Sequence, residues 1–185
     1  KKKEQREREL REKYKSDAKE IVAFYKANGI SQFFHYTDRR NLDSILQNNG
    51  LFSLNEMRNR GINYHQGSET CELPDYVRLS YTQNHPLLYI SKKQGRIRQE
   101  ETLNIDLGVA ELLQTEFTNV NAARTSTFPT VKRGNDLNFI RDNVKINIVK
   151  QRNYLNLSPD EKPYYQAEIM VKNHLPLEYI KNLLN

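Results

Sequence analysis

Cysteine is nearly absent from this sequence, and its scarcity excludes several kinds of site. Cys71 is the sole cysteine among 185 residues, so the chain forms no internal disulfide. No Cys and His residues stand at the spacings of a zinc site. Cys71 itself lies in a polar segment without an obvious paired base, which argues against a cysteine nucleophile. We therefore expect neither a disulfide framework nor a metal centre.

Long apolar runs are also missing. No run approaches the ~20 residues of a membrane span, and the start of the chain lacks the apolar core of a signal peptide. We therefore expect a cytoplasmic protein. The chain begins with lysine rather than methionine, which is compatible with its excision from a longer protein.

Glycine is sparse and scattered. The seven glycines form neither a Gly-x-Gly-x-x-Gly motif nor a P-loop, which argues against a Rossmann dinucleotide site and against a Walker nucleotide site. A Gly-x-Ser-x-Gly elbow is absent as well, so the chain does not present the nucleophile of an α/β-hydrolase.

The charge is positive and concentrated at the N-terminus. Lys and Arg number 29 against 23 Asp and Glu, for a net charge of +6, and residues 1–20 hold nine of the former and six of the latter. Such an excess permits a polyanionic partner without requiring one. We expect residues 1–28 to form a charged helix ended by Gly29 and residues 29–185 to form the main domain. The helix is either solvated and docked by its second half, which we favour, or a basic arm that touches nucleic acid.

The hydrophobic pattern predicts an α+β fold. Short strands, few long helices and no βαβ alternation argue against a doubly wound sheet. We expect strands at 32–37, 76–81, 102–107 and 164–171, short helices after Asp38 and at 136–141, and a strand or helix end at 145–150. We expect a small closing helix within 174–185, a mobile loop at 57–74, and further loops at 124–134 and 158–163.

The segment from Tyr164 to Val171 carries the strongest functional clue. Side chains alternate across a strand, so Gln166 and Glu168 would share one face, ~6.6–7 Å apart. An unpaired carboxylate is costly in a buried strand, so the chain must either pair it or use it. The plain alternative is a strand carboxylate paired with a lysine.

His35 and Thr37 would project from one face of an early strand, just before a helix N-terminus. A helix N-terminus suits an anionic ligand, and imidazole and hydroxyl groups suit sugar hydroxyls. Alone, His35 would be read as a structural histidine. Together with Gln166 and Glu168, it indicates a binding site.

These residues resemble the DarT family of DNA ADP-ribosyltransferase toxins. The opening block is Phe34-His35-Tyr36-Thr37 followed by Asn41-Leu42, Ile45-Leu46 and Gly50-Leu51, and the middle block runs from Asp75 to Tyr89. The closing block is Gln166-Ala167-Glu168-Ile169-Met170-Val171, and the three occur in the family's order over residues 33–181. The resemblance implies an ADP-ribosyltransferase-like fold, with two facing small sheets, flanking helices and a cleft for NAD.

The resemblance also implies roles for individual residues. Glu168 would bond a hydroxyl of the nicotinamide ribose and stabilise the oxocarbenium-like charge as nicotinamide leaves. The 158–165 loop would face the acceptor, where an aromatic side chain can stack a base. The expected set is Glu168 and Arg58 for catalysis, His35, Tyr36, Thr37, Asn41 and Tyr81 for NAD, and Tyr164 and Gln166 for the acceptor.

Arginine is where the chain departs from the family pattern. The family's catalytic arginine lies in the loop before its second block, where this chain has Arg58 and Arg60; we favour Arg58, although no motif fixes the register. Before Pro86, where the family commonly has Arg, this chain has Thr82-Gln83-Asn84-His85. We expect Arg78, on its strand, to pair or reach solvent rather than bind phosphate.

The expected activity is NAD-dependent mono-ADP-ribosylation of a nucleobase in single-stranded DNA, with NAD as co-substrate and no metal. The resemblance implies a toxin of a toxin–antitoxin or phage-defence system, restrained by an antitoxin such as a macrodomain ADP-ribosylglycohydrolase. Two alternatives stay open. The same fold could modify RNA or a protein side chain, or the chain could be an inactive nucleic-acid-binding domain.

Overall fold

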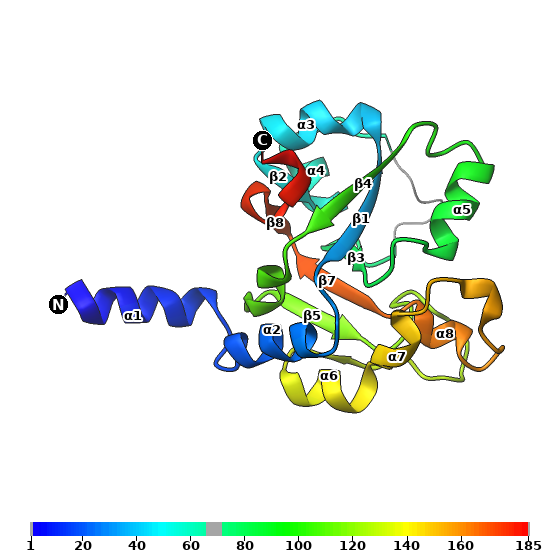
Figure 1. Cartoon of the computed structure of the whole chain (residues 1–185). Coiled ribbons are helices and arrows are strands. Elements are labelled where there is room, and N and C mark those ends of the chain that lie inside the picture. The colour runs from blue at the N-terminus through cyan, green and yellow to red at the C-terminus, as the bar shows by residue number, and fades with distance from the viewer. Residues whose placement is uncertain (1, 66–71, 185) are drawn as a thin grey trace.

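The computed structural model, which describes residues 2–65 and 72–184, is built on two antiparallel sheets. The main sheet has six strands in the order β4-β1-β3-β7-β5-β6, and β2 pairs with β8 in a second sheet (Figure 1). This arrangement confirms the predicted α+β class with two small sheets. The strands are β1 (Phe33–Asp38), β2 (Gly50–Phe52), β3 (Tyr76–Ser80), β4 (Glu100–Ile105), β5 (Thr115–Thr118), β6 (Arg133–Gly134), β7 (Glu168–Lys172) and β8 (His174–Pro176).

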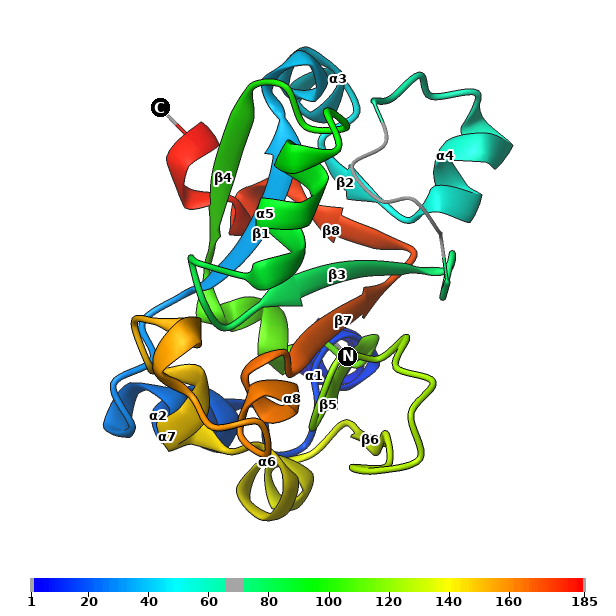
Figure 2. The same ribbon diagram turned by 90° about the vertical axis from the view of Figure 1, so that its right-hand side faces the viewer.

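Short helices flank the main sheet at both ends. In Figures 1 and 2, α3 and α5 lie toward the end that also carries the β2–β8 sheet, and α2, α6, α7 and α8 gather at the opposite end. The α-helices are α1 (Lys2–Lys13), α2 (Ala18–Ala27), α3 (Leu42–Gln47), α4 (Leu54–Arg60), α5 (Pro86–Lys93), α6 (Leu137–Asn143), α7 (Ile146–Val149) and α8 (Lys162–Tyr165). The 3-10 turns are η1 (Arg39–Asn41), η2 (Leu107–Glu111), η3 (Tyr154–Asn156), η4 (Leu177–Tyr179) and η5 (Lys181–Leu183). No helix among the described residues is long and apolar enough to cross a membrane.

The N-terminal segment forms two helices rather than the single helix expected. The break lies at residues 14–17, where Tyr14 bridges Leu112 and the Lys15 amide donates to the Glu111 carbonyl at 2.9 Å. The Lys15 ammonium bonds the Ala110 carbonyl at 3.0 Å. These tertiary bonds draw the chain onto η2 and override the helix propensity of its charged residues.

The second of these helices belongs to the core. Ile21 and Tyr25 of α2 are fully buried, and the Tyr25 ring packs edge-on against Phe33 at 5.3 Å. The Tyr25 and Tyr81 hydroxyls share a hydrogen bond of 2.7 Å. Residues 18–27 therefore pack into the same core as the main sheet.

Helix α8 replaces the beginning of the expected 164–171 strand. Pro163 stands in its first turn, where a missing N–H costs nothing, and the Tyr165 amide donates to the Glu161 carbonyl at 3.2 Å. Tyr165 is fully buried, with its hydroxyl 2.6 Å from Thr82 Oγ1. The strand begins only at Glu168, so the prediction that Gln166 and Glu168 share a strand face is wrong.

Two other segments also differ from expectation. The start of the expected 57–74 loop is the end of α4, which Ser53 caps and Gly61 ends with a φ of 64°. The remainder of that loop includes Cys71, which lies outside the described residues. The expected closing helix is instead strand β8 followed by η4 and η5.

Locally encoded elements were predicted more closely. The strands expected at 32–37, 76–81 and 102–107 are confirmed within two residues as β1, β3 and β4. Asp38 accepts a hydrogen bond from the Arg40 amide at 3.0 Å, and Asp136 accepts one from the Phe139 amide at 2.7 Å. Both are side-chain caps of the kind that sequence can indicate.

Candidate active site

A cavity of about 360 Å³ opens over β1 and β3. Residues from α3, β2, α4 and α5 also line it. The cavity brings together five of the predicted site residues, which come from β1, from η1 and from the first position of β7: His35, Tyr36, Thr37, Asn41 and Glu168.

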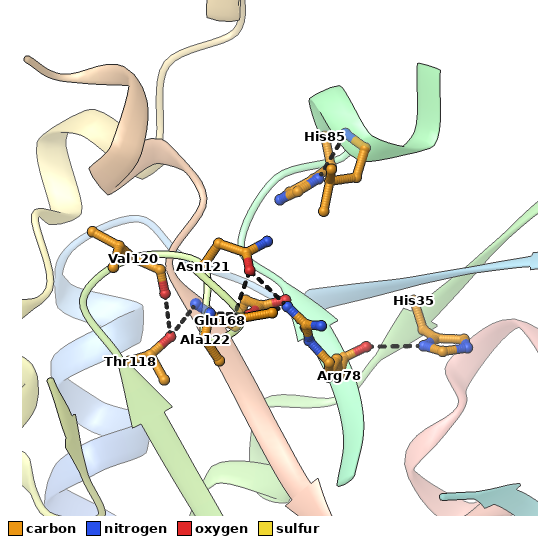
Figure 3. A network of polar contacts seen from close by, with 10 residues as sticks. His35, Arg78, His85, Thr118, Val120, Asn121, Ala122 and Glu168 are labelled. Atoms are coloured by element: carbon orange, nitrogen blue, oxygen red, sulfur yellow. Dashed lines mark hydrogen bonds and ion pairs between the residues drawn. The ribbon is translucent and has the colours of Figure 1, made fainter. Parts of the chain in front are cut away.

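Glu168 is held by an arginine of the neighbouring strand (Figure 3). It is only 6% exposed, and it pairs in register with Ser80 of β3. Arg78 stands two residues from Ser80 and therefore on the same face of the sheet. Its Nε lies 2.9 Å from Glu168 Oε1 and its terminal nitrogen 2.7 Å from Oε2, which is a bidentate ion pair.

The loop after β5 completes the carboxylate's environment. The Ala122 amide donates to Glu168 Oε2 at 2.7 Å, and Asn121 Oδ1 accepts from Arg78 at 3.0 Å (Figure 3). Thr118 Oγ1 accepts from the Glu168 amide at 3.1 Å. Within the described residues, Oε2 thus receives two hydrogen bonds and Oε1 one. A carboxylate offers about four acceptor positions, so Oε1 retains capacity for a ligand hydroxyl.

His35 presents a hydrogen-bond acceptor to the cavity. Its Nδ1 lies 3.0 Å from the Arg78 carbonyl oxygen (Figure 3), and because a carbonyl can only accept, Nδ1 carries the proton. In the neutral ring, Nε2 is then unprotonated. Burial lowers the pKa of His35, against the opposing effect of the Arg78 hydrogen bond, so the ring is neutral at pH 7.

Asn41 fastens a chain segment that lines the cavity. Its Nδ2 donates to Thr37 Oγ1 and to the His65 carbonyl, each at 3.0 Å, while its Oδ1 accepts from the His65 amide at 2.7 Å. Thr37 and Asn41 are both buried. The amide of Asn41 is thus engaged on both sides, which fixes the position of His65 relative to β1.

The two tyrosines expected to contact NAD lie in different environments. Tyr36 lines the cavity, and its hydroxyl donates to the Thr82 carbonyl. Burial raises the pKa of Tyr36, so the hydroxyl stays protonated. Tyr81 is 4% exposed in the core beside Tyr25 and is not among the residues that line this cavity.

The arginines expected in the site also lie elsewhere. Arg58 and Arg60 are exposed on α4 and do not line the cavity. Arg60 pairs with Glu56 at 3.0 Å and lies 4.5 Å over the Phe52 ring. The arginine beside the carboxylate is Arg78. Its alternation with Ser80 was visible in the sequence, but the register of β3 against β7 was not.

The two residues expected at the acceptor side belong to α8 and its end. The Tyr164 ring lies 5.9 Å from the Lys145 ammonium, and Gln166 ends the helix. Neither lines the cavity. Sequence reasoning also missed Asn121, which accepts a hydrogen bond from Arg78, and Ala122, whose amide reaches the carboxylate from a loop 46 residues before it.

Residues 2–65 and 72–184 contain no group of three or more His, Cys, Asp or Glu side chains that could hold a metal ion. The site offers instead a fixed carboxylate, a guanidinium and a neutral imidazole around one cavity. Such a set can bind a sugar hydroxyl and stabilise positive charge beside it.

Comparison with known proteins identifies this arrangement. Residues 34–184 match the family model described as DarT, ssDNA thymidine ADP-ribosyltransferase. The structure is similar to Thermus sp. 2.9 DarT in complex with carba-NAD+, with a TM-score of 0.62 at 16% identity over 82% of this chain and 80% of that one. It is similar to the same protein in complex with ADP-ribosylated ssDNA, with a TM-score of 0.59 at 17% identity over 82% and 79%. For Thermosipho africanus DarTG in complex with ADP-ribose, the TM-score is 0.61 at 18% identity over 81% and 42%. Curated protein sequences give no match.

Proposed function

Because this chain belongs to the DarT family of ssDNA thymidine ADP-ribosyltransferases, we propose that it transfers ADP-ribose from NAD+ to a thymine base of single-stranded DNA. The observation that carries the proposal for this chain is the bidentate Arg78–Glu168 pair at the wall of the cavity. Solved structures of the Thermus relative contain NAD+ and ADP-ribosylated ssDNA, which supports the same pair of substrates here.

Glu168 supplies the charge that the reaction needs. We assign its Oε1 to a hydroxyl of the nicotinamide ribose. The bond between the anomeric carbon and nicotinamide breaks with its electron pair going to nicotinamide, so positive charge develops on the sugar. A fixed carboxylate beside that sugar stabilises the developing charge more than it stabilises the ground state. Arg78 and Ala122 hold the carboxylate in place before the substrate arrives.

His35 and Thr37 are assigned to ribose hydroxyls. The unprotonated Nε2 of His35 accepts a hydrogen bond from a hydroxyl, and the Thr37 hydroxyl lies on the same face of β1. Asn41 acts indirectly by holding His65. The base nitrogen then attacks the anomeric carbon, and we assign its released proton to Glu168.

A single-stranded acceptor fits the physical demands of the reaction. A base inside a duplex must first be unpaired and unstacked, at a cost of a few kcal/mol. We place the enzyme in the cytoplasm, where it acts as the toxin of a toxin–antitoxin or phage-defence system and an antitoxin limits its effect on the host's own DNA. The DarTG name of the Thermosipho relative is in keeping with this role.

The test is a transfer reaction with labelled NAD+ and four acceptors. These are a thymine-containing single strand, the same strand without thymine, its duplex, and the RNA of equal sequence. Label on the thymine-containing single strand, located by mass spectrometry, is the expected result. Label only on RNA or on protein would instead support the alternative substrates. NAD+ that remains intact with every acceptor would support an inactive binding domain.

A further inference from the structure

A second hollow of about 380 Å³ adjoins the cavity that contains Glu168. Phe34 lines both hollows. The connection between β3 and α5 also borders both, because residues 82–84 line the second hollow and His85 lines the first. We call the second hollow the basic pocket, and its described lining consists of residues 29–32, 34, 81–84 and 149–152.

The basic pocket carries positive charge and no negative charge among its described lining residues. Lys150 and Arg152 follow α7, are exposed, and form no ion pair within the described part of the chain. The other polar side chains are uncharged hydroxyls and amides, from Ser31, Gln32, Thr82, Gln83, Asn84 and Gln151. Such a lining attracts an anion that also accepts hydrogen bonds.

The loop that carries the two cations is tied to neighbouring segments. Asn84 Nδ2 donates to the Arg152 carbonyl at 3.4 Å, which joins this loop to the connection after β3. The Lys150 ammonium lies beside Gly29, where a Cβ atom would stand 3.6 Å from its nitrogen. Both cations are therefore placed at the end of β3 by the fold.

The basic pocket lies next to the Glu168 carboxylate along β3. Ser80 pairs in register with Glu168, and Tyr81 and Thr82, which line the pocket, follow Ser80 directly. Thr82 Oγ1 also lies 2.6 Å from the hydroxyl of Tyr165, three residues before Glu168. Under the proposed function NAD+ occupies the first cavity, so the acceptor has to approach Glu168 from an adjoining surface. The basic pocket is such a surface, with the charge that attracts DNA.

We propose that Lys150 and Arg152 bind one backbone phosphate of the single-stranded DNA, next to the thymidine that is modified. This inference rests on the proposed function, which supplies the DNA. A phosphodiester carries one negative charge and accepts several hydrogen bonds, which matches two cations among uncharged polar side chains. The contact reads no sequence. It fixes the position of the strand, so that the thymine base reaches the anomeric carbon.

The double variant Lys150→Gln/Arg152→Gln removes both charges and keeps two polar side chains. Binding is measured without NAD+, by the fluorescence anisotropy of a fluorescein-labelled single strand that contains one thymidine, over a series of salt concentrations. We expect the Kd to rise about tenfold. We expect the slope of log K against log salt to fall in magnitude by ~0.7, which corresponds to one phosphate contact on a single strand.

The control is the double variant Lys172→Gln/Lys181→Gln. It removes the same charge from exposed residues that line neither hollow, so its affinity for the strand should stay near wild type. An equal loss in the two double variants would show general charge attraction alone and would overturn the inference.

A modified strand tests the group that is contacted. A methylphosphonate replaces one charged phosphodiester by a neutral group, and it is placed in turn at each phosphate on either side of the thymidine. At one position next to the thymidine, it should weaken binding to wild type about tenfold. It should leave binding to Lys150→Gln/Arg152→Gln unchanged, because the partners of that phosphate are already removed. Equal losses in both proteins at every position would overturn the inference.

Steady-state transfer separates the two substrates. In Lys150→Gln/Arg152→Gln the KM for DNA should rise about tenfold while the KM for NAD+ stays unchanged. A rise confined to the KM for NAD+ would place the diphosphate of NAD+ in the basic pocket and would overturn the inference. Failure of wild type to modify any DNA would count against the proposed function itself. An active wild type, with a double variant that binds the strand equally tightly, would overturn this inference alone.

Discussion

Arg78 and Glu168 lie 90 residues apart in the chain, yet they form two hydrogen bonds of 2.9 and 2.7 Å. The register that pairs Ser80 with Glu168 places them diagonally on one face of the main sheet. Asn121 and Ala122, in the loop after β5, add one hydrogen bond to Arg78 and one to Glu168, respectively. The carboxylate is thus oriented by the fold itself, which is the condition for electrostatic catalysis without reorganisation.

Glu168→Gln should reduce ADP-ribose transfer by about 10²–10³ because the developing charge loses its counter-charge. It should also lower the free energy of unfolding by about 1–3 kcal/mol, since both oxygens now accept hydrogen bonds and an amide NH2 must face a donor. Initial rates and urea unfolding measure the two effects. Turnover close to wild type in folded Glu168→Gln would remove this residue from the reaction.

Arg78→Met should cost about 3 kcal/mol of unfolding free energy because it leaves a buried carboxylate unpaired. The backbone carbonyl that bonds His35 is retained. The double variant with Glu168→Gln should lose less unfolding free energy than the sum of the losses in the two single variants.

Arg58→Ala is the matched control for Arg78→Met. That side chain is exposed on α4, so both stability and NAD+ hydrolysis should stay near wild type. A large loss of activity in Arg58→Ala would instead support Arg58 as the catalytic arginine, as the sequence analysis expects.

His35→Ala should raise the KM for NAD+ with a smaller change in kcat, because its contact exists in the ground state as well as the transition state. Calorimetry with a non-cleavable NAD+ analogue should show weaker binding. Unaltered affinity would make His35 a structural histidine.

Stability should fall on acidification from pH 6.5 towards pH 4. The pKa of His85 is near 6.5 in the unfolded chain and lowered by burial to about 4 in the folded protein, so between these values only the unfolded chain takes up the proton. The full effect is on the order of 3 kcal/mol. Urea unfolding at pH 7 and pH 4.5 should therefore show a smaller difference for His85→Asn than for wild type. An equal loss of stability between pH 7 and pH 4.5 in the two proteins would contradict the assignment of this effect to His85.

Tyr164→Ala should preserve NAD+ hydrolysis and weaken modification of single-stranded DNA. Tyr164 does not line the cavity, but it precedes Glu168 by four residues in the sequence and its ring lies beside the Lys145 ammonium. An aromatic ring can stack on a base, and a neighbouring cation can attract the phosphate of that nucleotide. The expected loss is about 1–3 kcal/mol in apparent DNA affinity. Tyr89→Ala, on the exposed face of α5, is the control.

The sequence predicted what depends on neighbours along the chain. Strand β1 and the Asp38 cap follow from alternation and from one side chain, and both are found. Arg78 could not be assigned, because its partner depends on the register between β3 and β7. The start of the last expected strand was predicted too early, because Tyr165, buried against Thr82, belongs to a turn of helix where the apolar pattern indicates a strand.

Helix α1 has a practical consequence for handling the enzyme. It leaves the body on the side opposite α5 (Figure 1), and its 12 residues extend over ~18 Å. Its base is fixed because the Lys15 and Leu113 amides bond the carbonyls of Glu111 and Lys13. A surface linker or fluorophore attached at the exposed Lys3 would therefore stand clear of the cavity. The immobilised enzyme should keep its access to both substrates.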